Sequence, residues 1–182
     1  GSDHDTLNGN DGVDQITSAA GNDTIDAGAG NDTIVMAGNL ATGDVVDGGD
    51  GTDIISITTA NLTTLAGYSI SAATALNGKI SNVEQLTVSD AVNVGANFDM
   101  ARMDSINNIY LAAGITGNEG FSGLASGATV TDVVADNANT DILTMALGDS
   151  TGTADVLNYT MTNATGIDFG VLAVSGVETL NI

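Results

Sequence analysis

An aspartate recurs every nine residues through the first third of the chain, and a large apolar residue follows it two places later. The spacing lengthens once, where Met36 to Gly38 insert three residues, and then resumes. A short fixed period indicates a solenoid, in which each unit buries its apolar residue only by stacking on its neighbours. The aspartates in phase are Asp5, Asp14, Asp23, Asp32, Asp44 and Asp53.

Each unit has the length of one short strand and one half-circle turn. Three residues with a single inward apolar side chain form the strand, and the six before them reverse the chain, which requires glycine at positive φ. Two units therefore make one coil, and units on the same side lie 18 residues apart. We expect Asp5 to stack on Asp23 and Asp14 on Asp32, with a same-side spacing of 21 beyond the insertion.

Stacked carboxylates predict a bound cation. The chain has 23 Asp+Glu against 2 Lys+Arg, a net charge of −21, so a compact state repels itself unless positive charge comes from outside. Calcium accepts six to eight oxygens in a flexible geometry, whereas magnesium demands a stricter octahedron. We therefore expect several Ca2+ ions, bound by the six aspartates and by backbone carbonyls of the tight turns. The candidate carbonyls are those of Gly9, Asp11, Gly12, Gly21, Gly28, Gly30, Gly48, Gly49, Asp50 and Gly51.

Two other interpretations of the repeat remain open. The aspartates could face water on a polar solenoid, or the tract could be a Gly/Asp linker, but neither needs glycine and apolar residues locked in phase with aspartate. Within the repeat, the unit Asn39 to Asp47 lacks glycine at its first, second and fourth places. Sites that use this unit should be the weakest.

The units resemble a known family. Residues 9–17 read GNDGVDQIT, residues 27–35 read AGAGNDTIV and residues 48–56 read GGDGTDIIS. This pattern is similar to the repeat-in-toxin (RTX) nonapeptide G-G-x-G-x-D-x-U-x, where U is a large apolar residue. The resemblance covers the first third of the chain and implies a calcium-binding parallel β-roll in a secreted bacterial protein.

Residues 57–182 leave the nonapeptide pattern but continue as short β-branched runs between Gly, Asn, Asp and Ser. The fold class we expect is all-β, a parallel β-roll over 1–56 that continues into an irregular β-solenoid over 57–182, as a fragment of a longer surface protein. Short helical turns are expected near Asn61 to Ala66 and Asp99 to Ile106. The strand runs are 55–59, 83–88, 106–111, 128–134, 141–147, 155–161 and 177–182.

A few polar residues outside the repeat are weaker candidates. Glu84 and Glu178 lie in the near-copies SNVEQLTV and SGVETLNI. Each is either a catalytic carboxylate or metal ligand, or an outward strand residue that contacts a neighbouring backbone group or a cation, and the second is favoured. Arg102 is expected to form a surface ion pair with Asp99 or Asp104. The segments 136–141 and 148–155 are rich in oxygen side chains but lack the EF-hand spacing, so solvated turns are favoured.

The order of the segments narrows the resemblance further. An RTX tract followed by a long Thr/Ala/Val/Gly-rich solenoid with VETLN-type strands is similar to bacterial RTX S-layer proteins of the Caulobacter type. That resemblance implies type I secretion, a location on the cell surface and self-association in a calcium-linked lattice. An RTX adhesin or biofilm module that binds cell-surface polysaccharide, and the accessory part of a secreted hydrolase, are the alternatives.

The composition and the motifs argue against nucleic-acid binding, membrane association and enzymatic activity. Strong acidity argues against nucleic acid or an anionic membrane surface as partner, and no apolar run approaches the roughly 18 residues of a membrane span. His4 is the only histidine, cysteine is absent, and neither G-x-S-x-G nor H-E-x-x-H occurs. We therefore expect no enzymatic activity, and a chain that stays unfolded at the low calcium of the cytosol and folds outside.

Overall fold

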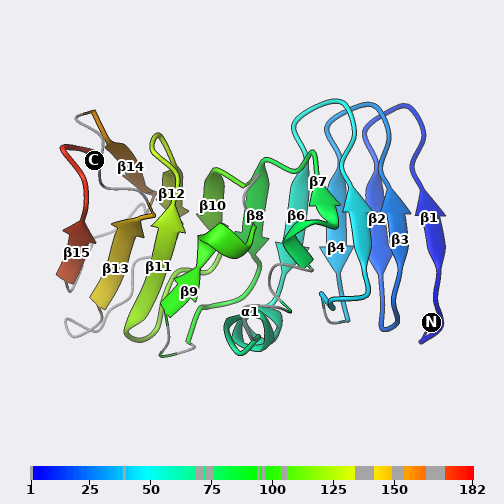
Figure 1. Cartoon of the computed structure of the whole chain (residues 1–182), viewed down its shortest axis with the longest axis horizontal. Coiled ribbons are helices and arrows are strands. Elements are labelled where there is room, and N and C mark those ends of the chain that lie inside the picture. The colour runs from blue at the N-terminus through cyan, green and yellow to red at the C-terminus, as the bar shows by residue number, and fades with distance from the viewer. Residues whose placement is uncertain are drawn as a thin grey trace.

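The computed structural model describes residues 2–38, 40–68, 72, 76–93, 95, 97–103, 106–133, 142–148, 154–162 and 171–182. Its strands pair in parallel and follow one another along the long axis of the molecule (Figure 1). Successive strands alternate between two sides, so each coil contributes one strand to each side. The expected all-β parallel roll that continues into a solenoid is confirmed.

One side is a single sheet of the even-numbered strands. These are β2 (Gln15–Ser18), β4 (Thr33–Met36), β6 (Ile54–Ile57), β8 (Gln85–Val88), β10 (Asn108–Leu111), β12 (Thr129–Asp132), β14 (Val156–Met161) and β16 (Thr179–Asn181). Because β6 pairs with β8, the sheet continues across the end of the nonapeptide tract.

The other side consists of two sheets of odd-numbered strands. The first contains β1 (Thr6–Asn8), β3 (Thr24–Asp26), β5 (Val45–Asp47) and β7 (Ile80–Ser81). The second contains β9 (Asn97–Asp99), β11 (Glu119–Leu124), β13 (Ile142–Leu147) and β15 (Val171–Ser175). The strands β7, β9, β11 and β15 lie outside the runs expected from the sequence; β7 and β9 are short, and glycine interrupts β11.

Helix α1 (Thr59–Ala66) follows β6 and precedes β7 in the chain, and it lies at the edge of the molecule (Figure 1). The Thr58 side chain accepts a hydrogen bond from the Asn61 N–H at 3.3 Å and so caps the first turn. Leu62 and Leu65 are buried, and Asn61 Nδ2 donates to Met36 O at 2.9 Å. The expected helical turns are confirmed here and in the 3-10 helix Met100–Arg102.

A narrow core lies between the two sides. The apolar residue of each coil sits directly over that of the next, and the strands show alternating buried and outward positions. Full burial of such a side chain contributes about 1.5–3 kcal/mol. The stacked residues of the even-numbered sheet include Ile16, Ile34, Ile55, Leu86, Ile109 and Val130.

Candidate metal centre

Three stacked turns connect odd-numbered to even-numbered strands in the repeat, and we call them the glycine-rich row. They comprise residues 9–14, 27–32 and 48–53, and parallel bridges join Asp11 to Ala29 and Ala29 to Asp50. Each turn has two residues at positive φ, at equivalent positions. These are Asn10 and Gly12, Gly28 and Gly30, and Gly49 and Gly51, with φ from 70° to 147°.

Close stacking makes glycine necessary in this row. A Cβ on Gly30 would lie 1.5 Å from Gly12 O, and one on Gly51 would lie 1.9 Å from Gly30 O. These are backbone atoms that cannot move aside without separating the coils. The turns therefore bring carbonyl oxygens against the α-carbons of the next turn.

The row also stacks its carboxylates. The Asp14 N–H donates to Asp32 Oδ1 at 2.8 Å, and the Asp32 N–H donates to Asp53 Oδ1 at 2.7 Å. The second oxygens are different: Oδ2 of Asp14, Asp32 and Asp53 are buried and have no hydrogen-bond partner among the described residues. A buried oxygen without a donor costs free energy, which a cation would recover.

Backbone oxygens lie beside these atoms. The position of a Cβ on Gly9 is 3.1 Å from Asp14 Oδ2 and 2.3 Å from Ala27 O. A carboxylate oxygen of this turn and a carbonyl oxygen of the next turn thus both lie close to Gly9, and oxygens of these two kinds are ligands of hard cations such as Ca2+. No group of three His, Cys, Asp or Glu side chains that could bind a metal occurs in the described part of the chain, so backbone oxygens must complete any such site.

The predicted carbonyls divide unequally between the two sides. Gly9, Asp11, Gly12, Gly28, Gly30, Gly48, Gly49, Asp50 and Gly51 belong to the glycine-rich row. In two of them the oxygen already accepts a hydrogen bond from the neighbouring turn, since the Asp50 N–H donates to Gly28 O and the Gly30 N–H donates to Asp50 O, both at 2.8 Å. Gly21 lies in the opposite row of turns.

The opposite row contains Asp5, Asp23 and Asp44, stacked by the same contact. The Asp5 N–H donates to Asp23 Oδ1 and the Asp23 N–H donates to Asp44 Oδ1, both at 2.9 Å. Here the second oxygens have protein donors: Ser18 Oγ donates to Asp23 Oδ2, and the Ala41 N–H donates to Asp44 Oδ2 at 2.7 Å. These two carboxylate oxygens therefore have protein donors, whereas in the glycine-rich row a cation would have to take that place.

The electrostatics of the two rows differ accordingly. The hydrogen bond from Ser18 lowers the pKa of Asp23 below its ordinary value, and the one between Asp23 and Asp5 acts in the same direction. Burial raises the pKa of Asp53 above its ordinary value, and the charges of Asp32 and Glu84 add to the rise, whereas the hydrogen bond from Asp32 opposes it. The ionised carboxylate of Asp53 is therefore disfavoured by its surroundings, and a neighbouring cation would stabilise it.

Glu84 and Glu178 have the same structural role. Glu84 Oε2 accepts from the Asp53 N–H at 2.7 Å, and Glu178 Oε2 accepts from the Asp155 N–H at 2.9 Å. Each glutamate thus occupies the position that an aspartate takes in the repeat. Of the other candidates, 136–141, 149–153, Asp104 and the side chain of Arg102 lie outside the described residues. Asp99 Oδ1 accepts from the Ala101 N–H at 3.2 Å.

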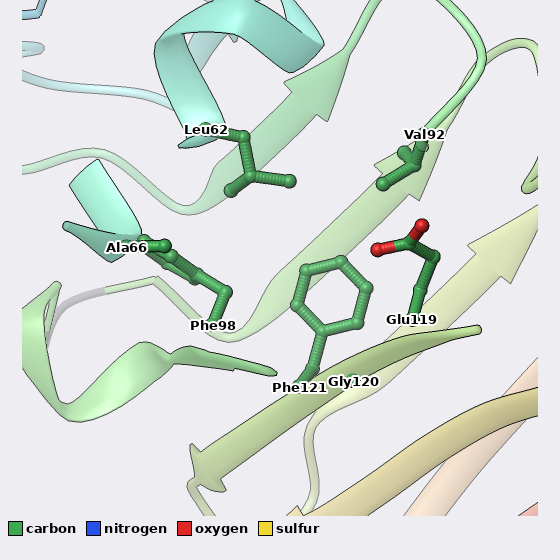
Figure 2. Close-up of a pocket in the computed structure, with 7 residues that line it drawn as sticks. All are labelled: Leu62, Ala66, Val92, Phe98, Glu119, Gly120 and Phe121. Atoms are coloured by element: carbon green, nitrogen blue, oxygen red, sulfur yellow. The ribbon is translucent and has the colours of Figure 1, made fainter. Parts of the chain in front are cut away.

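A second, apolar region lies under α1. Figure 2 shows Leu62 of α1, Phe98 of β9 and Phe121 of β11 pointing toward one another, with the Glu119 carboxylate beside the Phe121 ring. Glu119 is 3% exposed, and its Oε1 accepts from the Gly95 N–H at 3.2 Å. This region belongs to the core. An open hollow of about 280 Å³ adjoins it, with Asn97 and Thr144 in its lining.

Comparison with known proteins agrees with the geometry of the turns. Residues 1–34 match the RTX calcium-binding nonapeptide repeat, in four copies. Such repeats bind calcium and typify secreted proteins, so this part of the chain is a calcium-binding structural module. Neither the curated proteins nor the solved structures contain a match to the chain. None of the helices in the described residues has the length and apolarity to cross a membrane.

Proposed function

We propose that the chain is a calcium-dependent structural module of a secreted bacterial surface-layer protein, which folds and then self-assembles when calcium binds. The observation that carries this proposal is the set of buried Oδ2 atoms of Asp14, Asp32 and Asp53. Their turns supply carbonyl oxygens at close range, and the chain has almost no cations of its own. External calcium is the charge that completes this arrangement.

Calcium concentration sets the state of the module. Where calcium is scarce, stacked carboxylates repel one another and the unfolded chain is favoured, which suits export by a type I secretion system. Outside the cell, millimolar calcium fills sites with dissociation constants of roughly 10⁻⁴ to 10⁻³ M. Binding to the folded state alone stabilises it, by about 2.7 kcal/mol per site at one hundred times the dissociation constant.

The strong negative charge of the chain supports self-association that depends on calcium. At a net charge of −21 copies of the chain repel one another, and divalent ions between carboxylates would reverse that repulsion. Val45 is exposed on β5, so this side of the roll is accessible to a neighbouring copy. Cell-surface polysaccharide is a further partner in this proposal.

Assembly is tested by adding calcium to chelator-treated protein while light scattering and negative-stain electron microscopy are recorded. We expect large ordered two-dimensional arrays in millimolar calcium and none in magnesium. Single molecules that persist in saturating calcium would contradict the surface-layer function and favour an RTX adhesin, or the accessory part of a hydrolase.

A further inference from the structure

The glycine-rich row has a fourth member that the nonapeptide pattern does not include. Asp53 Oδ1 accepts from the Asp32 N–H, and Glu84 Oε2 accepts from the Asp53 N–H, both at 2.7 Å. The ladder of backbone amide to carboxylate therefore continues from Asp53 to Glu84, across a coil of 31 residues that contains α1. Glu84 Oε1 is the counterpart of the aspartate Oδ2 atoms.

The oxygens around Gly48 repeat those around Gly9. The position of a Cβ on Gly48 lies 2.9 Å from Asp53 Oδ2 and 1.9 Å from Asn82 O. At Gly9 the corresponding atoms are Asp14 Oδ2 and Ala27 O. The two arrangements share a carboxylate oxygen of the same turn and a carbonyl oxygen of the next coil, although Asn82 belongs to no nonapeptide.

Hydrogen bonds fix the short turn between β7 and β8 against the end of β5 and the start of the turn 48–53. The Gly48 N–H donates to Ser81 O at 3.0 Å, and Asn82 Nδ2 donates to Asp47 Oδ1 at 2.7 Å. Asn82 adopts a φ of 52°, a left-handed conformation that asparagine tolerates better than most residues. These contacts hold the Asn82 carbonyl against the turn 48–53.

Asp53 supplies an independent observation that points to a cation. Its side chain is 0% exposed, and Oδ2 has no hydrogen-bond partner among the described residues. It lies between the carboxylates of Asp32 and Glu84, which donate nothing when ionised. A buried carboxylate oxygen among negative groups favours a cation over a neutral ligand.

We infer that Asp53, Asn82 and Glu84 form an additional calcium site at the junction of the repeat with the rest of the solenoid. Asp53 Oδ2, the Asn82 carbonyl and the Glu84 carboxylate are its protein ligands, with oxygens of the turn 48–51 and water to complete the coordination. All are oxygens, the donor set that calcium accepts. The ion ties the turn before β6 to the turn before β8, and so couples the roll to the following coils.

This inference rests on the proposed calcium binding by the glycine-rich row, and one experiment separates the two. Calcium bound to the full chain is counted by equilibrium dialysis for the wild type, Glu84→Gln and the control Asp26→Asn. Glutamine keeps an oxygen that accepts from the Asp53 N–H but removes the charge. Asp26 is exposed on β3, so its substitution makes the same change in net charge away from the site.

We expect Glu84→Gln to bind one ion fewer than the wild type, or to bind one ion about tenfold more weakly, because the charge of the ligands sets calcium affinity. Asp26→Asn should bind as the wild type does. Hydrogen exchange gives a second readout: calcium-dependent protection of Gln85–Val88 should be lost in Glu84→Gln, while that of Thr33–Met36 is kept.

Equal ion counts, affinities and protection in the wild type and Glu84→Gln would overturn the junction site and leave the proposed function intact. A wild type that binds no calcium would overturn both.

Discussion

At the scale of the residue, the repeat aspartates share one backbone contact and differ in their second oxygen. Asp23 Oδ2 accepts from Ser18 Oγ, whereas Asp32 Oδ2 has no donor among the described residues. The nine-residue period predicts the stacking of all six aspartates, because stacking depends only on spacing. It does not predict the hydrogen bond from Ser18, because that contact depends on the path of the turn. It does not predict the position of Glu84 either, because 31 residues separate Glu84 from Asp53 and the nine-residue period does not continue across them.

Gly30→Ala tests the close approach of the turns. The substitution forces a side chain to φ +137° and places its Cβ 1.5 Å from Gly12 O. We expect a loss of about 3 kcal/mol or more in the free energy of unfolding, measured by urea denaturation in saturating calcium.

Gly127→Ala is the matched control for this substitution. Gly127 also has positive φ, +87°, but a Cβ there meets no described atom within 4 Å. It should cost only about 1 kcal/mol of backbone strain. Equal losses for the two variants would show that stacking of the turns does not require glycine at position 30.

At the scale of the element, the sequence predicts those strands whose residues have high β-propensity and alternate between buried and outward positions. The even-numbered strands β8, β10 and β12 lie within runs expected from their β-branched or alternating residues. β11 was missed because Gly120 and Gly123 interrupt it, and glycine is a poor strand former. Its neighbours β9 and β13 pair with it on both sides, and this pairing compensates for its weak propensity.

Leu65→Ala tests whether α1 is part of the core or an appendage. Leu65 is 2% exposed and belongs to the same buried cluster as the strands. We expect the substitution to cost about 3 kcal/mol in the free energy of unfolding, because it leaves a cavity. The exposed Thr64 provides the control, since Thr64→Ala should change stability by no more than about 0.5 kcal/mol. A loss below about 1 kcal/mol for Leu65→Ala would mean that α1 packs loosely.

At the scale of the whole molecule, one buried cluster extends from Ile16 to Tyr159. The coil length varies along it, from 18 residues in the repeat to 31 around α1, yet each coil still places an apolar side chain over the last. The sequence predicts this continuity through its recurrent strands. It does not predict how α1 interrupts the odd-numbered side, because the position of an inserted helix depends on tertiary contacts.

The central claim is that calcium in the glycine-rich row decides whether the chain folds. The most direct test follows far-UV circular dichroism while calcium is added to the chelator-treated wild type, Asp32→Asn and the charge-matched Asp26→Asn, with magnesium as the ion control. We predict a cooperative gain of β-signal with calcium alone, and a midpoint about tenfold higher for Asp32→Asn than for the other two. A full β-signal in excess chelator, or the same midpoint for all three proteins, would contradict the account.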